Sequence, residues 1–406
     1  MIPKVIFSEG KKDWVKRPLL SNIDKILDYR GRTPKKLGLS WSDTGYLALS
    51  ALNVKNGYID FNADANYGDQ ELYDRWMGDN HLHKGQVVFT TEAPMGNVAQ
   101  LPNDDLYILS QRTIAFEVKH DLIREDFLAT LLRSPKIFNE LTSLSSGGTA
   151  KGVSQKSLSN LKVCVPTSLE EQSAIGSLFR TLDDLLASYK DNLANYQSLK
   201  VTMLSKMFPK ARQTVPEIRL DGFEGEWKKD TLEPYLTESR ISGDTGLTAK
   251  KITVKLWGKG VIEKEEKYAG SSNTQYFIRK AGQFIYSKLD FQNQAFGIIP
   301  NELDGYQSTL DLPTFDIQNI DPKFLLEYVM RRDFYEYQGL IANGSRKAKR
   351  IHPEDFLVMP VRIPSLEEQQ TIGTYFSNLD NLIASHQEKI SQLETLKKKL
   401  LQDMFI

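Results

Sequence analysis

The stretch Ser168-Leu169-Glu170-Glu171-Gln172 decides the architecture of this chain, because it returns as Ser365-Leu366-Glu367-Glu368-Gln369. The two segments stay in register over 41 residues, of which 18 are identical. The heads of the two halves also match, since Pro3, Trp14 and Leu19 have the spacing of Pro216, Trp227 and Leu232. A repeat of roughly 200 residues is too long for a solenoid and has the size of a domain with an appended segment. The sequence therefore predicts an internal duplication.

Both repeated segments are predicted to be long helices that begin with a capping box. Ser168 and Ser365 can each accept a hydrogen bond from a free backbone N–H of the first turn, while Glu171 and Glu368 reach back to the N-cap N–H. The first helix is expected to end at Phe208, because a proline follows it and cannot continue the hydrogen-bond ladder. The second is expected to run to the last residue of the chain.

Apolar residues recur inside both helices at alternating steps of three and four, which is the pattern of a heptad seam. We expect the two helices to pair with each other as a coiled coil. Lys200 and Lys397 also take a seam position, which costs stability but can set the register. The predicted helix–helix packing residues are Phe179, Leu182, Leu186 and Leu193 in the first helix and Phe376, Leu379, Ile383, Ile390 and Leu393 in the second.

The stretch before each helix alternates strand-like and helix-like patterns, which predicts a mixed α+β globular domain. Strands are expected at Gln86–Phe89 and Gln283–Tyr286, and helices at Phe127–Phe138 and Phe324–Tyr335. The predicted fold is thus two tandem mixed α/β domains and two long helices. Its predicted boundaries are a first domain at 1–166, a helical spacer at 167–208, a second domain at 209–363 and a second spacer at 364–406.

The composition bounds the class of protein. The 52 Lys and Arg residues balance the 52 Asp and Glu residues, which weakens a nucleic-acid interpretation, although local basic runs can make a basic face on a neutral protein. The one cysteine cannot form an intrachain disulfide, and Met1–Lys12 has no apolar run like that of a secretion signal. No stretch has the about 18 uninterrupted apolar residues that a membrane span needs. We expect a cytoplasmic protein.

Motifs that would indicate catalysis are missing from the sequence. The five histidines are scattered and, with one cysteine, give no zinc spacing. The chain has no G-x-x-x-x-G-K-[ST] phosphate loop and no Pro-Pro pair, so it lacks the N/D-P-P-F/Y corner of adenine methyltransferases. We expect no catalytic residue and no metal ligand, so a self-contained DNA enzyme is disfavoured.

A duplicated frame with divergent loops is suited to reading a long partner at two places, and double-stranded DNA is the favoured partner. Polar and basic side chains on loops would read bases, with Arg favouring guanine and Asn or Gln favouring adenine. The main alternative is a scaffold whose coiled coil joins proteins and whose heads bind peptides. The candidate DNA-binding residues are Arg30, Arg32, Thr90, Thr91, Glu92, Asn97 and Lys151 in the first half and Lys288, Gln292, Asn293, Arg346, Lys347, Lys349 and Arg350 in the second.

Across its whole length the sequence resembles the specificity (S) subunits of type I restriction–modification systems. The resemblance rests on the P-x-x-E-E-Q-type entry to each long helix, the W-x4-L head of each half, the stretch Tyr29–Pro34 and the stretch Thr90–Asn97. It implies that two target recognition domains alternate with two helical regions that pair as an antiparallel coiled coil. Each domain would read one half of a split DNA target, and the helix length would set the gap.

The resemblance also implies the partners of this chain. Two methyltransferase (M) subunits would dock on it, and the restriction or translocase (R) subunits would join through them. S-adenosylmethionine, ATP and magnesium would belong to those partners, and this chain would bind no cofactor. The family has no fixed list of base-reading residues, so the candidates above rest on loop position.

Overall fold

The computed structural model describes residues 14–145, 151–210, 212–265, 271–341 and 350–405. Its contacts divide the chain into two compact units, Met1–Asp191 with Glu388–Ile406 (unit 1) and Asn192–Gln387 (unit 2). Each unit holds a globular part, the start of one long helix and the end of the other. None of the helices in the described ranges is long and apolar enough to cross a membrane.

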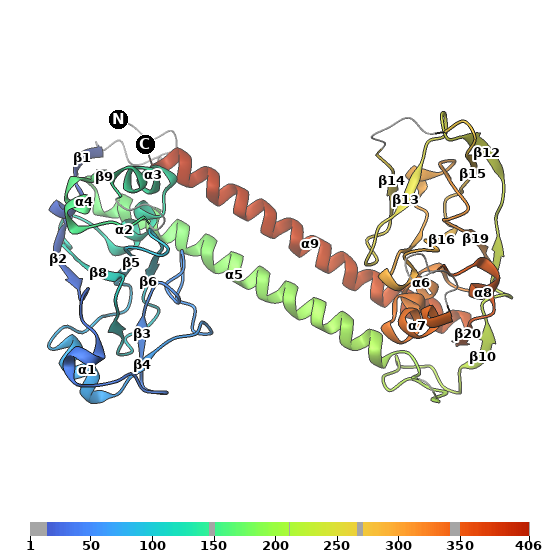
Figure 1. Ribbon diagram of the computed structural model, residues 1–406, viewed down its shortest axis with the longest axis horizontal. Helices are drawn as coiled ribbons and strands as arrows, with labels where there is room; N and C mark the ends of the chain where they lie inside the picture. Colours follow the sequence, from blue (N-terminus) through green and yellow to red (C-terminus); the bar gives the residue numbers. More distant parts are fainter. Residues whose placement is uncertain (1–13, 146–150, 211, 266–270, 342–349, 406) are drawn as a thin grey trace. The chain divides into compact units, whose positions relative to one another are not determined.

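Unit 1 is built on an antiparallel four-stranded sheet of order β2-β8-β5-β6 (Figure 1). Val87 and Phe89 of β5 face one hydrophobic core and Val88 faces another, as the alternation of side chains in a strand requires. The strands are β1 (Trp14–Pro18), β2 (Ile23–Asp28), β3 (Tyr46–Leu49), β4 (Tyr67–Gly68), β5 (Val87–Thr90), β6 (Val98–Gln100), β7 (Ile108–Leu109), β8 (Thr113–Val118) and β9 (Lys162–Pro166); the helices are α1 (Gln70–Met77), α2 (Glu125–Leu132), α3 (Pro135–Leu144) and α4 (Gln155–Asn160).

Unit 2 repeats this sheet with the equivalent order β11-β19-β16-β17. This shared strand order confirms the internal duplication, although the strands around the sheet differ between the two units. The strands are β10 (Lys228–Thr231), β11 (Leu236–Glu238), β12 (Ser242–Thr245), β13 (Ile252–Val254), β14 (Val261–Glu263), β15 (Gln275–Ile278), β16 (Phe284–Tyr286), β17 (Phe296–Ile298), β18 (Gln307–Ser308), β19 (Thr314–Ile317) and β20 (Pro360–Ile363); the helices are α6 (Pro322–Met330), α7 (Arg332–Gln338) and α8 (Pro353–Leu357). Short 3-10 turns include η3 at Phe291–Asn293.

The predicted strands at 86–89 and 283–286 are confirmed within one residue as β5 and β16. The single helix predicted at 127–138 is wrong, because α2 ends at Leu132 and α3 starts anew at Pro135. Ser134 caps α3 with its side chain, and a proline in the first turn favours such a restart. The helix predicted at 324–335 is broken in the same place, since Arg331 is extended between α6 and α7.

The long helices are α5 (Leu169–Lys206) and α9 (Leu366–Met404). The Oγ atoms of Ser168 and Ser365 each accept from a backbone N–H at 3.3 Å, as predicted. The second half of the capping box is wrong: the Glu171 carboxylate accepts instead from the indole N–H of Trp14 at 3.2 Å. Its equivalent Glu368 accepts from Trp227 at 3.3 Å, so these carboxylates satisfy indole donors that the core would otherwise leave unpaired. Helix α5 ends at Lys206, two residues before the predicted end.

Each unit anchors the start of one long helix and the end of the other in a single aromatic cluster. Phe405, after the last turn of α9, lies 6.3 Å from Phe179 of α5 between ring centroids and 5.8 Å from Phe127. In unit 2 the equivalent Phe208 lies 6.1 Å from Phe376 and 5.6 Å from Phe324. The helix ends are therefore held by burial as well as by capping.

The long helices run antiparallel within each unit. In unit 1 Lys190 pairs with Glu394 and Asp183 pairs with Lys397, so residue numbers fall on α9 as they rise on α5. In unit 2 Lys200 pairs with Asp380. The predicted seam residues Phe179, Leu182, Leu186, Phe376 and Leu379 are buried, and Leu193, Ile383, Ile390 and Leu393 are half-buried. Knobs-into-holes packing along the pair stays a prediction.

The two seam lysines sit in charge triads of opposite composition. Lys200 contacts Asp380 at 2.7 Å and Glu327 of α6 at 3.2 Å, so one cation serves two acids. Its equivalent Lys397 contacts Asp183, which Arg133 also contacts at 2.7 Å, so one acid serves two cations. Burial would lower the pKa of Lys200, but the two carboxylates outweigh it and raise that pKa.

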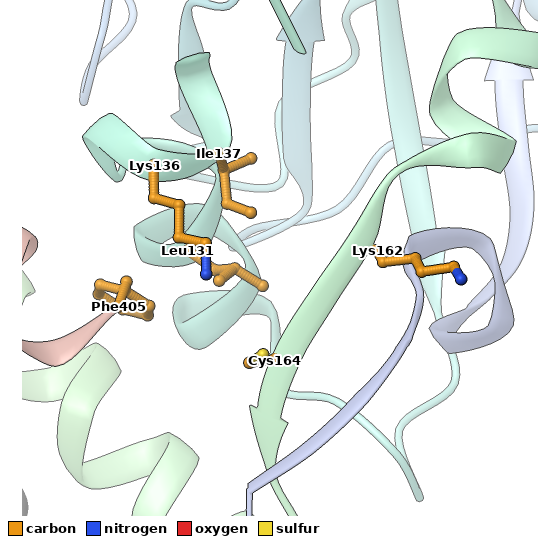
Figure 2. A pocket seen from close by; sticks show the side chains of 6 residues that line it. All are labelled: Leu131, Lys136, Ile137, Lys162, Cys164 and Phe405. Carbon is orange, nitrogen blue, oxygen red and sulfur yellow. The ribbon is translucent and has the colours of Figure 1, made fainter. Parts of the chain in front are cut away.

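The core of unit 1 is closely packed where α9 ends. The cavity there measures about 10 Å³, which is at most the room for one water molecule. Figure 2 shows its lining, which comes from α2, α3, β9 and the residue after α9: Leu131, Lys136, Ile137, Lys162, Cys164 and Phe405.

Candidate nucleic-acid interface

The structure brings together, in unit 1, loops that lie far apart in the sequence. The β5–β6 loop carries the predicted residues Thr91, Glu92 and Asn97, and the described segment that begins at 151 carries Lys151. Val153 donates its backbone N–H to the Thr91 carbonyl at 2.9 Å, and Thr91 donates to the Arg112 carbonyl at 2.7 Å. Three segments therefore meet at the end of the central sheet where β5 ends and β8 begins.

Unit 2 makes the same connections with different side chains. Ile351 donates its N–H to the Lys288 carbonyl at 3.1 Å, and Lys288 donates to the Asp311 carbonyl at 3.0 Å. Because backbone hydrogen bonds hold these loops in both units, their side chains can differ while the backbone arrangement stays the same. Arg112 of unit 1 thus corresponds to an acid, Asp311, in unit 2. We call these two surfaces the loop edge of unit 1 (Arg30, 91–97, 110–112 and 151–153) and the loop edge of unit 2 (287–295, 309–311 and 350–351).

Charged groups on the loop edge of unit 1 partly neutralise one another. Arg30 forms an ion pair with Asp28, and Glu92 pairs with Arg112 at 2.8 Å. Burial would raise the pKa of the Asp28 carboxyl, but hydrogen bonds from Arg30 outweigh it and lower that pKa. Lys151 is exposed and makes no ion pair with a described residue. It is therefore the most available cation of this edge.

Arg32 is exposed and held by two contacts away from the charged cluster. Its guanidinium lies 4.7 Å from the centre of the Tyr29 ring and donates to the Trp76 carbonyl. A cation over an aromatic face keeps its charge while its orientation is restricted. These two contacts use one of its N–H donors and one face of the guanidinium, so other donors remain for a phosphate.

Two of the predicted contacts need correction. Thr90 is fully buried and its hydroxyl accepts from the Asn97 N–H at 2.9 Å, while Thr91 is 1% exposed and donates to the Arg112 carbonyl at 3.2 Å. Both hydroxyls are buried and bonded to backbone groups of Asn97 and Arg112, so these two residues hold the loop and offer no free hydroxyl to a ligand. Asn97 is half-buried and its amide donates to the Val54 carbonyl at 2.9 Å, so its side chain also holds a loop in place.

The loop edge of unit 2 has more available polar groups. Lys288 is half-buried and makes no ion pair with a described residue, and Gln292 is exposed. Asn293 is held by Asp290 through a hydrogen bond of 3.2 Å, and Arg350 lies 3.7 Å from Asp311. Arg346, Lys347 and Lys349, which were also predicted to bind DNA, lie outside the described residues.

Sequence reasoning missed two residues that build these edges. Arg112 has a φ of +69°, exposes its side chain and supplies the carbonyl that holds Thr91. Arg279 is fully buried, and its guanidinium donates to the Thr309 carbonyl of the loop edge at 3.4 Å, as well as to the Ser239 carbonyl at 2.9 Å and to Ser308 Oγ at 2.8 Å. Burial lowers the pKa of Arg279 to about 10. Neither residue stands in a recognisable motif, because each acts through partners distant in sequence.

A second surface of unit 2 is an open groove of about 1270 Å³ between the end of α5, helices α6 and α7 and strand β20. The corresponding place in unit 1 is the cavity of Figure 2, which measures only about 10 Å³. Tyr337 and Leu340 in the groove are 71% and 67% exposed. Its basic rim residues, which make no ion pair with a described residue, are Arg212, Lys229 and Arg362.

Comparisons with known proteins agree on one family. A family model described as type I restriction modification DNA specificity domain matches residues 9–195 and 247–395. A curated relative, the type I restriction enzyme MjaVIII specificity subunit of Methanocaldococcus jannaschii, is 23% identical over 319 residues, covering 72% of this chain and 72% of that protein.

Solved structures share the fold over the full length. The S subunit of the type I restriction–modification system from M. genitalium matches with a TM-score of 0.61 at 15% identity, covering 100% of this chain and 99% of that chain. A second chain, from a structure concerned with complex assembly and conformational transition of the type I R-M system, has a TM-score of 0.51 at 16% identity, covering 96% of this chain and 97% of that chain.

Proposed function

The chain belongs to the type I restriction–modification DNA specificity family, and from this premise we propose that each of its units reads one half of a bipartite DNA target. The observation that carries the proposal is the pair of loop edges, where equivalent backbone hydrogen bonds support different charges. Two domains that recognise different half-sites need the same backbone scaffold with different side chains on it. Phosphate contacts would position each edge, and base contacts would specify the sequence.

In this proposal the paired helices α5 and α9 set the gap between the half-sites and dock the methyltransferase subunits. The open groove of unit 2 supports a docking role, because an exposed apolar surface with a polar rim is typical of protein interfaces. Restriction subunits would join through the methyltransferase subunits. The chain itself would be non-catalytic, with S-adenosylmethionine, ATP and magnesium bound by the partners.

A domain exchange tests the assignment of one unit to one half-site. Residues 1–166 are replaced by those of a relative with a different target, and modified bases are mapped in a host that expresses the chimera with the methyltransferase subunit. We expect one half of the target to change and the other to stay. A change in both halves, or in neither, contradicts the assignment.

Matched insertions test the role of the helices. One heptad is inserted after Gln197 and another after Ala384, which lies opposite it because Tyr196 contacts His386. Seven helical residues add about 10.5 Å, so the gap should grow by about 3 base pairs at about 3.4 Å each. Both half-sites should remain unchanged. An unaltered gap in an active complex contradicts the proposal.

The alternative is a scaffold that binds only proteins, and the groove of unit 2 is the observation that favours it. A salt titration of duplex binding separates the two functions. Neutralising several phosphates makes the logarithm of the binding constant fall steeply with the logarithm of salt concentration. Protein partners bound without any affinity for duplex DNA would favour the scaffold.

A further inference from the structure

An exposed tryptophan stands at the tip of the β13–β14 hairpin of unit 2. The two strands pair from Ile252 with Glu263 to Val254 with Val261, and the residues between them are Lys255-Leu256-Trp257-Gly258-Lys259-Gly260. Trp257 is 57% exposed, whereas each of the other four tryptophans of the chain is buried or half-buried. An exposed indole offers a partner both a large apolar ring and an N–H donor.

Backbone hydrogen bonds hold the tip in place, and Trp257 within it has a strained backbone conformation. Trp257 has a φ of +60°, a region that residues other than glycine rarely adopt. Its N–H donates to the Asn293 carbonyl at 2.8 Å, and the next N–H, of Gly258, donates to the Gln294 carbonyl at 3.0 Å. A Cβ on Gly258 would lie 2.1 Å from the Met330 side chain, so the tip fits tightly against α6. Strain maintained in this way is typical of functional positions.

The same hydrogen bonds join the tryptophan to the loop edge of unit 2. Asn293 and Gln294 belong to the β16–β17 loop, which also carries the exposed Gln292 and the cation Lys288. The hairpin tip that carries the indole therefore lies beside the loop edge that, in the proposed function, faces DNA. Lys255 and Lys259 flank it, are exposed and make no ion pair with any described residue.

Unit 1 has a comparable arrangement built from other residues. Tyr58 is 58% exposed in a loop that Gly57 holds to the β5–β6 hairpin by donating its N–H to the Val98 carbonyl at 2.7 Å. Asn97 holds the same loop through the Val54 carbonyl. An exposed ring beside the candidate loop edge thus occurs in both units, on loops of unrelated sequence.

We propose that Trp257 wedges its indole against the base stack of the half-site that unit 2 reads, while Lys255 and Lys259 bind phosphates on either side. The inference rests on the proposed function and names a residue that determines specificity. Apolar side chains inserted at a base step unstack it at a cost that depends on the sequence, so the wedge selects flexible steps without reading hydrogen-bond donors. Two flanking cations hold the ring over the groove.

The test uses the full chain in complex with its methyltransferase subunit and a duplex that contains the mapped target. Trp257→Ala should weaken specific binding roughly 10- to 100-fold, as loss of aromatic stacking on a base does, and Trp257→Phe should lose less. Leu247→Ala removes another exposed apolar side chain of unit 2, at 58% exposure, and should leave the affinity unchanged. Lys255→Gln with Lys259→Gln should reduce the salt slope by about 2.

Fluorescence reports the contact directly. A 2-aminopurine base at the contacted step should change its emission on binding of the unsubstituted chain and keep its duplex emission with Trp257→Ala. The Trp257 emission, isolated by difference from Trp257→Phe, should be shielded from acrylamide when DNA is added.

Unchanged affinity of Trp257→Ala overturns the inference and leaves the proposed function standing. Shielding by the methyltransferase subunit without DNA also overturns it and makes the tip a protein contact. If the unsubstituted complex shows no specific binding, the proposed function itself fails.

Discussion

Replacing Lys200 by methionine should destabilise unit 2 by about 2–3 kcal/mol. The side chain of Glu327 beside it is only 10% exposed, and that of Asp380 is 46% exposed. Removing one partner of a buried ion pair costs about 3–5 kcal/mol because an uncompensated charge stays behind, and the exposure of Asp380 reduces this cost. The variant leaves two acids facing each other without their shared cation.

The chain supplies its own matched control in Lys397→Met. Asp183 keeps the ion pair with Arg133 at 2.7 Å, so this substitution should cost about 0–1 kcal/mol. Hydrogen exchange is measured as a function of denaturant concentration. Exchange in α2 reports the stability of unit 1, and exchange in α6 reports the stability of unit 2. Lys200→Met combined with Glu327→Gln should recover at least half of the loss, because the buried charge is then absent.

The stability defect of Lys200→Met should depend on pH, and Glu327 sets the direction of that dependence. Burial raises the pKa of Glu327, so the native state loses stability as pH rises through that pKa, and loss of Lys200 raises the pKa further. The defect of Lys200→Met should therefore be smaller in mildly acidic buffer than at pH 8. The reasoning is refuted if Lys397→Met is as damaging as Lys200→Met, or if the defect of Lys200→Met is independent of pH.

Three further predictions concern the anchoring of the long helices. Gly176→Ala should lower the free energy of unfolding by about 1–3 kcal/mol, because the added Cβ would lie 2.3 Å from Cβ of Asp126. Alanine in place of glycine usually stabilises a helix, so a thermal melt that shows stabilisation would contradict this prediction. Ser365→Ala should cost about 1 kcal/mol through the lost N-cap, measured by chemical denaturation, and Ser377→Ala within the same helix serves as control. Burial raises the pKa of the Glu171 carboxyl, so the stability of Glu171→Gln relative to the unsubstituted chain should grow as pH rises from about 4.3 to neutrality; a constant difference in melting temperature across that range would speak against a buried charge.

The candidate site was only partly predictable from the sequence. Turn composition and strand endings pointed to the loops that form both edges, and Lys151, Lys288 and Gln292 indeed offer available polar groups there. Thr90 is the last residue of β5 and Thr91 the first of the following loop, but both are buried and their hydroxyls bond to backbone groups. Arg112 and Trp257 gave no signal, since their roles depend on backbone carbonyls that arrive from other segments.

The sequence by itself determined the duplication, the two capped helices and the central strands. Such features are encoded by spacing and by capping residues within a few positions, so local physics suffices to predict them. Only the tertiary structure decided that the Glu171 carboxylate accepts a hydrogen bond from Trp14. It also decided that the third member of one charge triad is the cation Arg133 and that of the other is the acid Glu327. Which loops meet at each loop edge was decided in the same way. Those choices depend on which distant groups are buried together, because a buried donor or charge must find its partner wherever the chain brings one.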